Sequence, residues 1–215
     1  MKPDEVASYL RDHPEFFEHY ADMLAEIFIP HPHGGRAVSI SERQMLTLRE
    51  KNKQLESKLR DVIQFGEEND AISEKVQRIS IALLGTSSLA GVLNAVYLSL
   101  REDFAVPHVA LRVWRGNAPP ELPEFAPVSD ASREFTTSLA HPYCSSRAMV
   151  DTASLFGETG AQLRSFSYVP LRNGETFGLL ALASEDPQRF YPEMGTLYLK
   201  RLGELIGAAI ARQLG

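Results

Sequence analysis

Cysteine and positive charge are both scarce in this chain of 215 residues. Its one cysteine cannot form an intrachain disulfide, which is typical of a reducing compartment, so we expect a cytoplasmic protein. The 22 Lys and Arg residues are outnumbered by 28 Asp and Glu residues, a net charge of −6. Because binding to phosphates needs an excess of cationic side chains, this balance argues against a nucleic acid as partner.

Long apolar runs are also few, and one of them tests for a membrane span. Residues 79–100 carry no formal charge and could cross a bilayer by length. Gly85 in the middle suits the position after a helix, and Ser87 or Ser88 suits the N-cap of the next one. We therefore predict two buried amphipathic helices joined by a turn and no membrane span. The first 20 residues carry charges every few positions, so we expect no signal peptide.

Familiar catalytic and metal-binding motifs are absent from the sequence. It contains neither a phosphate-binding glycine loop nor a G-x-S-x-G elbow. His31 and His33 are close together in a loop, but zinc sites need more ligands at defined spacing. We expect a protein that is not an enzyme, with no catalytic residue and no metal site, and the identity of any cofactor stays open.

Hydrophobic periodicity divides the chain into three segments. In residues 1–38, apolar positions predict two short helices over 3–29, followed by a loop rich in Pro and Gly. Residues 39–86 form one long charged helix. Residues 87–215 form a compact α+β domain. The domain organisation is therefore a small helical segment, a long helix and a globular domain.

The long helix carries a narrow apolar stripe with coiled-coil spacing. Asn52 falls at an a position, where a buried Asn costs stability but fixes register and oligomer state. The pattern then fails at Gly66 and Asn69 and resumes in a shifted frame at Ile72. We predict a parallel homodimer; the alternative is a monomeric helix packed on its own domain. The members of this stripe, which would form the dimer seam, are Met45, Leu48, Asn52, Leu55, Leu59 and Val62.

The last segment alternates between helical and strand patterns. A helix follows Ser88, residues 108–114 alternate as a strand, and strands over 165–171 and 176–183 flank an Asn173-Gly174 turn. A final helix covers 193–213. This order predicts an α+β fold with an antiparallel sheet and helices on one face. Residues 116–164, the covering segment, would lie over the other face and leave a cavity.

Motifs along the whole chain resemble one bacterial family. They include His13-Pro14-Glu15-Phe16-Phe17, Gly34-Gly35, Pro142-Tyr143-Cys144, Val169-Pro170-Leu171 and Arg189-Phe190. This set is similar to the GAF-like family known as domain of unknown function 484. The resemblance implies a GAF-like sheet and a cytoplasmic bacterial setting, and brings no established ligand or reaction. The family usually has Gly after Pro-Tyr-Cys, where this chain has Ser145, which puts a tight turn there in doubt.

A small molecule could bind in the expected cavity. Arg112 lies mid-strand on the cavity side and could clamp a carboxylate or phosphate, although a local salt bridge is the commoner role. Cys144 beside His141 could be a thiolate, although a lone cysteine is usually a buried apolar residue. The candidate ligand-binding residues are Arg112, Trp114, Tyr143, Cys144, Ser145 and Tyr168.

Three hypotheses for function remain open. The first is a homodimeric sensor or regulatory protein that binds a small anionic or aromatic molecule and signals to an unknown protein partner. In the second, the cavity is filled by side chains, and the protein is an adaptor whose helices dock partners. The third is a redox sensor or enzyme built on Cys144.

Overall fold

The computed structural model describes residues 2–29, 38–116 and 122–214. The predicted Pro- and Gly-rich loop, with His31 and His33, lies outside these residues. The chain forms two compact units, Met1–Glu67 and Glu68–Gly215, which we call the N-terminal and C-terminal units. The C-terminal unit thus takes in the end of the long helix, whereas the sequence places the start of its globular domain at residue 87.

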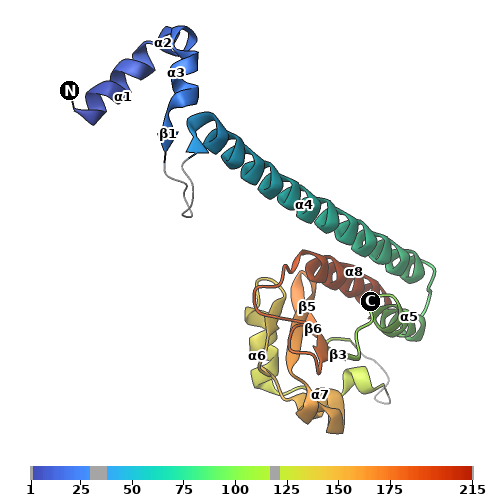
Figure 1. Ribbon diagram of the computed structural model, residues 1–215. Coiled ribbons are helices and arrows are strands. Elements are labelled where there is room, and N and C mark those ends of the chain that lie inside the picture. The colour runs from blue at the N-terminus through green and yellow to red at the C-terminus, as the bar shows by residue number, and fades with distance from the viewer. Residues whose placement is uncertain (1, 30–37, 117–121, 215) are drawn as a thin grey trace. The chain divides into compact units, whose positions relative to one another are not determined.

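Short helices make up the first part of the N-terminal unit (Figure 1). They are α1 (Pro3–Asp12), α2 (Glu15–His19) and α3 (Ala21–Glu26), one more than predicted. Proline begins α1, and the Lys2 backbone N–H donates to the Glu5 carboxylate over 2.9 Å, which satisfies the free end of the helix. Strand β1 (Phe28–Ile29) pairs with β2 (Val38–Ser39) in antiparallel fashion.

A single helix, α4 (Ile40–Leu84), confirms the predicted long helix. Its described side chains from 43 to 67 are all exposed. From residue 68 onward one face of α4 packs into the core of the C-terminal unit, where Ile79 is 0% exposed and Leu83 is 4% exposed, whereas Ile81 and Leu84 on the other face stay exposed. The shift in heptad frame at Gly66 and Asn69 therefore coincides with the start of the C-terminal unit.

The uncharged run 79–100 consists of two helices, as predicted. Helix α4 ends before Gly85, and α5 (Leu89–Glu102) begins after Ser88, whose hydroxyl accepts a hydrogen bond from the Gly91 N–H over 3.2 Å. Throughout the described part of the chain, we find no helix with the length and apolar character that crossing a membrane requires.

Four antiparallel strands form the sheet of the C-terminal unit. They are β3 (His108–Val113), β4 (Tyr143–Ser145), β5 (Ser165–Asn173) and β6 (Glu175–Ser184), in the order β3-β6-β5-β4. The predicted turn joins β5 to β6, with Gly174 at φ +79°. These features confirm the α+β class. Strand β4 was not predicted, because three residues are too few to show alternation.

Helices cover both faces of this sheet (Figure 1). Helix α5, the last turns of α4 and α8 (Leu197–Leu214) pack on one face, over Leu111 and Val169. On the other face lie α6 (Asp130–Ser138), α7 (Thr152–Phe156) and η2 (Gly157–Gln162), all from the covering segment. The first helix of that segment, η1 (Pro123–Phe125), instead lies beside β3, and Phe125 packs against the core under α5 and α8, so the prediction that the whole segment covers one face is wrong for this part. Residues 117–121 of the segment lie outside the described part.

Helix α8 lies unusually close to β5. A Cβ atom added at Gly203 would lie 2.5 Å from Val169 Cγ1, and one added at Gly207 would lie 3.2 Å from the Arg172 carbonyl oxygen. Glycine at these two positions therefore permits the close approach.

Candidate functional site

The structure separates the six candidate ligand-binding residues. Arg112 and Trp114 belong to β3 and its end, on one edge of the sheet, whereas Tyr143 and Ser145 belong to β4 on the opposite edge. Tyr143 pairs with Tyr168 of the neighbouring strand, so these two lie side by side. Cys144 packs with Val169 and Leu171 under α8, on the other face. No common site is formed by all six.

Side chains fill the space between the sheet and the covering segment. Tyr168 is 0% exposed, and the Phe135 ring meets it edge-on with centroids 5.4 Å apart. The Tyr168 hydroxyl accepts a hydrogen bond from the Met149 N–H over 3.0 Å, and burial raises the pKa of Tyr168. The cluster consists of Ala110, Leu163, Phe166, Tyr168, Leu179, Ala181 and Ala183, with Trp114, Phe135, Leu139, Val150, Leu155 and Phe156 against it. The space expected to form a cavity is thus a second core.

Arg112 is engaged by the covering segment itself. Its Nη2 donates to the Ser154 carbonyl oxygen over 2.6 Å, and its Nη1 donates to the Leu111 carbonyl oxygen over 2.9 Å. Ser154 lies in α7, so the guanidinium attaches this short helix to the edge strand. The structure therefore gives Arg112 a structural bond where the sequence suggested an anion clamp.

A second attachment of the covering segment was missed from the sequence. Glu124 in η1 is 6% exposed, and the Tyr97 hydroxyl on α5 donates a hydrogen bond to its carboxylate. The pKa of Tyr97 is raised mainly by burial and secondly by the nearby Glu124 carboxylate. Glu124 sits in a proline-rich stretch without periodicity, so no sequence signal marked it as buried.

Cys144 is placed where its thiol is poorly reactive. It is 2% exposed, and burial raises the pKa of its thiol, although the Ser167 hydroxyl opposite acts in the other direction. A raised pKa leaves little thiolate, the nucleophilic form, at neutral pH. Ser145 next to it accepts a hydrogen bond from the Arg147 N–H over 3.0 Å, a serine turn in place of the family's glycine.

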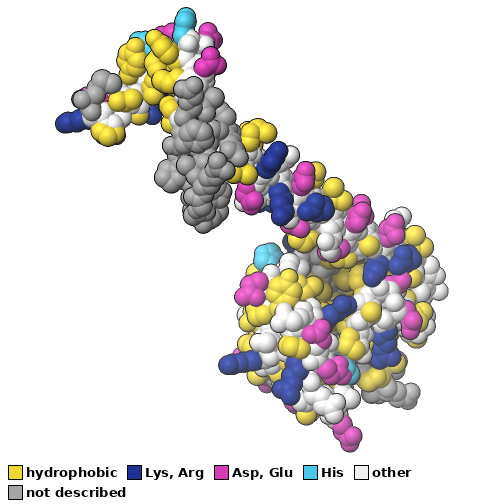
Figure 2. All heavy atoms as spheres, viewed as in Figure 1, with side chains coloured by type: hydrophobic (Ala, Val, Ile, Leu, Met, Phe, Trp, Pro, Cys, Tyr) yellow, Lys and Arg dark blue, Asp and Glu magenta, His cyan; other side chains and the backbone are white. Residues whose placement is uncertain are grey.

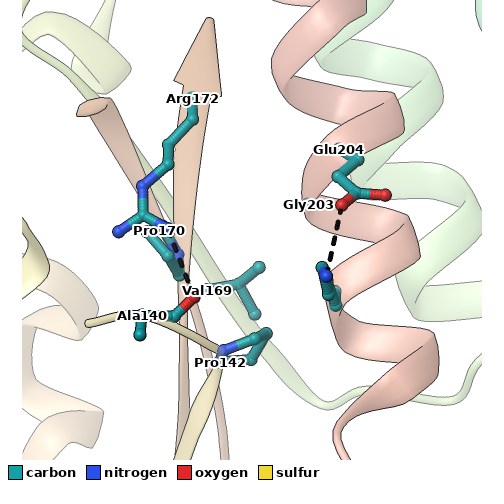
Figure 3. Close-up of a pocket in the computed structure, with 8 residues that line it drawn as sticks. Ala140, Pro142, Val169, Pro170, Arg172, Gly203 and Glu204 are labelled. Carbon is teal, nitrogen blue, oxygen red and sulfur yellow. Dashed lines mark hydrogen bonds and ion pairs between the residues drawn. The ribbon is translucent and has the colours of Figure 1, made fainter. Parts of the chain in front are cut away.

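One pocket lies where β5, α8 and the stretch before β4 meet (Figure 3). Arg172 points into it from β5, and Pro142 and Gly203 form opposite walls. The Arg172 guanidinium donates to the Leu139 and Ala140 carbonyl oxygens and, over 3.0 Å, to the Thr176 hydroxyl. The pocket measures about 140 Å³, whereas small-molecule sites usually hold roughly 300–1,000 Å³. Over residues 2–29, 38–116 and 122–214, no three His, Cys, Asp or Glu side chains gather to hold a metal ion.

Large apolar side chains of the N-terminal unit stand open to solvent. Leu48 is 60% exposed, Leu55 64% and Val62 65%. All three belong to the predicted coiled-coil stripe that runs from Met45 to Val62, which we call the α4 stripe. A stripe of this kind on a charged helix is the usual mark of a coiled-coil partner. The exposed surface of the chain, and not its interior, is therefore the strongest candidate for function.

Comparison with known proteins identifies a family. The model described as "Protein of unknown function, DUF484" matches residues 1–213. The chain belongs to the DUF484 family. This confirms the family indicated by the motifs. The DUF484 chain is also similar to "Uncharacterized protein YigA" of Salmonella typhimurium, with 23% identity over 214 residues that cover 96% of this chain and 90% of that protein.

Two solved GAF domains are similar to this chain over about two thirds of its length. The first, described as "A. Aeolicus nlh2 gaf domain in an inactive state", is 14% identical. The match covers 67% of this chain and 98% of the solved chain, with a TM-score of 0.49. The second, the GAF domain of the potassium sensor histidine kinase KdpD from Escherichia coli, is 17% identical. This match covers 66% of this chain and 94% of the solved chain, with a TM-score of 0.42.

Proposed function

We propose that this DUF484 protein is a non-catalytic, homodimeric regulatory adaptor that acts in the cytoplasm. The observation that carries the proposal is a contrast in packing. The space expected to hold a ligand is filled by a second core around Tyr168, while the apolar stripe of α4 is uncovered. Of the three hypotheses from the sequence, this arrangement favours the adaptor.

The α4 stripe supports a parallel dimer. Five of its six members are apolar and more than half exposed, so a second α4 could cover them. Asn52 at an a position would face its copy and fix the register. In the same frame Lys51 occupies a g position and Glu56 the following e position, where they attract each other across a parallel pair. Balanced charge beside a narrow apolar stripe is what such pairing requires.

The interior supports an adaptor over a small-molecule sensor. Arg112, the predicted anion clamp, is bonded to α7, and Tyr168 is bonded to Met149. The pocket beside Arg172 has about half the volume of the smaller ligand sites. Buried Cys144 offers little thiolate for a redox or catalytic role. The functional surfaces would then be the exposed helices.

Light scattering on the intact chain tests the dimer through Asn52→Leu. Since an apolar residue at this a position removes the register constraint, we expect the variant to shift from dimers toward a higher or mixed oligomer. Lys53→Leu, away from the stripe, is the control and should scatter as the unchanged protein does. Equal scattering from all three proteins would refute the dimeric stripe.

A thermal-shift series separates the adaptor from the sensor. The intact protein is heated alone and with a panel of anionic and aromatic metabolites at millimolar concentration. The adaptor predicts an unchanged melting temperature throughout, because the second core leaves no room for a ligand. A compound that raises the melting temperature in the unchanged protein, but not in Arg172→Gln, would instead establish a sensor with its site beside Arg172.

A further inference from the structure

Helices α1–α3 carry apolar side chains, and none of those that the structure describes is buried. Every described side chain from residue 2 to 23 is exposed or half-buried. Tyr9 is 51% exposed, Phe17 38%, Tyr20 53% and Met23 39%. Figure 2 shows hydrophobic side chains gathered over these helices. Phe16 stacks on Tyr20 with ring centroids 4.7 Å apart, but no described side chain of these helices is buried, so their contacts offset little of the entropy of ordering three helices. A surface of this kind is completed by another molecule.

Charge limits what that molecule can be. Residues 1–29 contain seven acidic and two basic residues, whereas the rest of the chain contains 21 acidic and 20 basic residues. Nearly all of the net charge of −6 is therefore concentrated in the helices that carry the exposed rings. Glu15, Glu18 and Asp22 are exposed and alternate in sequence with Phe17, Tyr20 and Met23. The apolar face thus has an acidic rim.

Each alternative occupant is disfavoured by the same charge. A second copy of α1–α3 carries the same excess of acid and would be repelled, and the remainder of this chain is close to neutral. Anionic phospholipid and nucleic acid surfaces are repelled as well. A cationic rim around an apolar ridge is the complementary surface, and complementary charge raises both the rate and the selectivity of docking.

We propose that α1–α3 form a docking site for a partner protein that presents a basic amphipathic helix. The apolar stripe of that helix would cover the exposed side chains of Phe17, Tyr20 and Met23. Its Lys or Arg side chains would pair with the acidic rim. This inference rests on the adaptor function proposed above, since it specifies the chemistry of the adaptor's partner.

Two synthetic peptides of 18 residues test the site. They share one leucine stripe at helical spacing, with Lys at every polar position of one and Glu at every polar position of the other. Fluorescence anisotropy with the full-length protein at 150 mM NaCl should show at least tenfold tighter binding of the Lys peptide. The triple variant Glu15→Lys, Glu18→Lys, Asp22→Lys should exchange the preference and bind the Glu peptide more tightly.

Matched variants locate the binding. Phe17→Ser with Tyr20→Ser should weaken the Lys peptide at least tenfold, while Leu98→Ser with Leu197→Ser, which are 58% and 57% exposed in the C-terminal unit, should leave binding unchanged. A triple reversal elsewhere, Glu102→Lys, Glu134→Lys and Glu175→Lys, makes the same change in net charge and should keep the preference for the Lys peptide.

Several results would overturn the inference. The first is equal affinity of the full-length protein for both peptides. The second is binding of the Lys peptide that is unchanged in both the acidic triple variant and the Phe17→Ser, Tyr20→Ser variant. The third is equal loss of this binding in the C-terminal control variants. Sedimentation of the same samples distinguishes this failure from that of the dimer. A dimer without peptide preference refutes the docking site alone, and a monomer with the predicted preference refutes the dimeric arrangement alone.

Discussion

Replacing Leu55 with alanine should weaken the dimer by an amount that follows from its exposure. Full burial of a leucine side chain contributes about 1.5–3 kcal/mol. Leu55 is 64% exposed, so covering it should contribute roughly two thirds of that value, about 1–2 kcal/mol per copy. A symmetric dimer loses the contribution twice, about 2–4 kcal/mol, and the dissociation constant should therefore rise by roughly 30- to 1,000-fold.

Sedimentation equilibrium over a concentration series measures this change. Alanine is the best helix former, so Leu55→Ala leaves the helix itself intact. Leu46→Ala is the matched control, because Leu46 is also an exposed leucine of α4, 41% exposed, but lies outside the stripe. We expect the control to dissociate as the unchanged protein does. Equal weakening by both substitutions, or an unchanged protein that is monomeric at micromolar concentration, would show that the stripe does not join two chains.

Three further predictions concern the C-terminal unit, and the first has a control in the N-terminal unit. Gly203→Ala places a methyl group 2.5 Å from a side chain of β5 and should destabilise the unit by about 1–3 kcal/mol in urea unfolding, whereas Gly66→Ala meets no atom within 4 Å and should raise the helicity of α4 by circular dichroism. Tyr168→Phe removes the acceptor of a backbone N–H under the covering segment and should cost about 1–3 kcal/mol by the same assay; an unchanged midpoint would contradict the bond. Cys144 should resist thiol reagents until the protein is unfolded. Because burial raises its pKa, the buried neutral thiol contributes its full stability below the ordinary thiol pKa, and this is lost as pH rises through the raised value; rapid labelling of the native protein at pH 8 would refute this.

Long periodic elements were predictable, and short or irregular ones were not. Helix α4 and the β5–β6 hairpin follow from periodicity over many residues and from a strong turn signal at Asn173-Gly174. Strand β4 has three residues, and its alternation becomes visible only through its pairing with β5. That pairing places Tyr143 and Cys144 on opposite faces, and for this reason the sequence grouped two residues that do not meet.

The expected cavity shows a different limit of sequence analysis. Alternation along β3 correctly places Arg112 on the face opposite Leu111. It cannot say what covers that face, because the covering segment folds through contacts distant in sequence, such as Phe135 on Tyr168. An irregular stretch with aromatic residues can line a cavity or fill one, and in this chain it fills the space.

The heptad shift was visible in the sequence, but its meaning was not. The periodicity shows that the frame breaks at Gly66 and Asn69, but not what the shifted frame packs against. In the structure, the shifted frame with Ile79 and Leu83 packs into the chain's own core, while the frame before it is exposed. The two alternatives for α4 thus apply to different parts of one helix: residues 68–84 pack on their own domain, and the earlier part stays a predicted coil.

No described side chain before residue 68 is buried, so the stability of the N-terminal unit depends on the supply of a molecule that covers it. By mass action its helices are protected only while something covers them, whereas the C-terminal unit persists on its own core. Copies in excess of the binding partner would expose the N-terminal unit to proteases. After cleavage only the C-terminal unit would remain, and it could no longer assemble. The concentration of intact protein in a cell would then depend on the concentration of its binding partner.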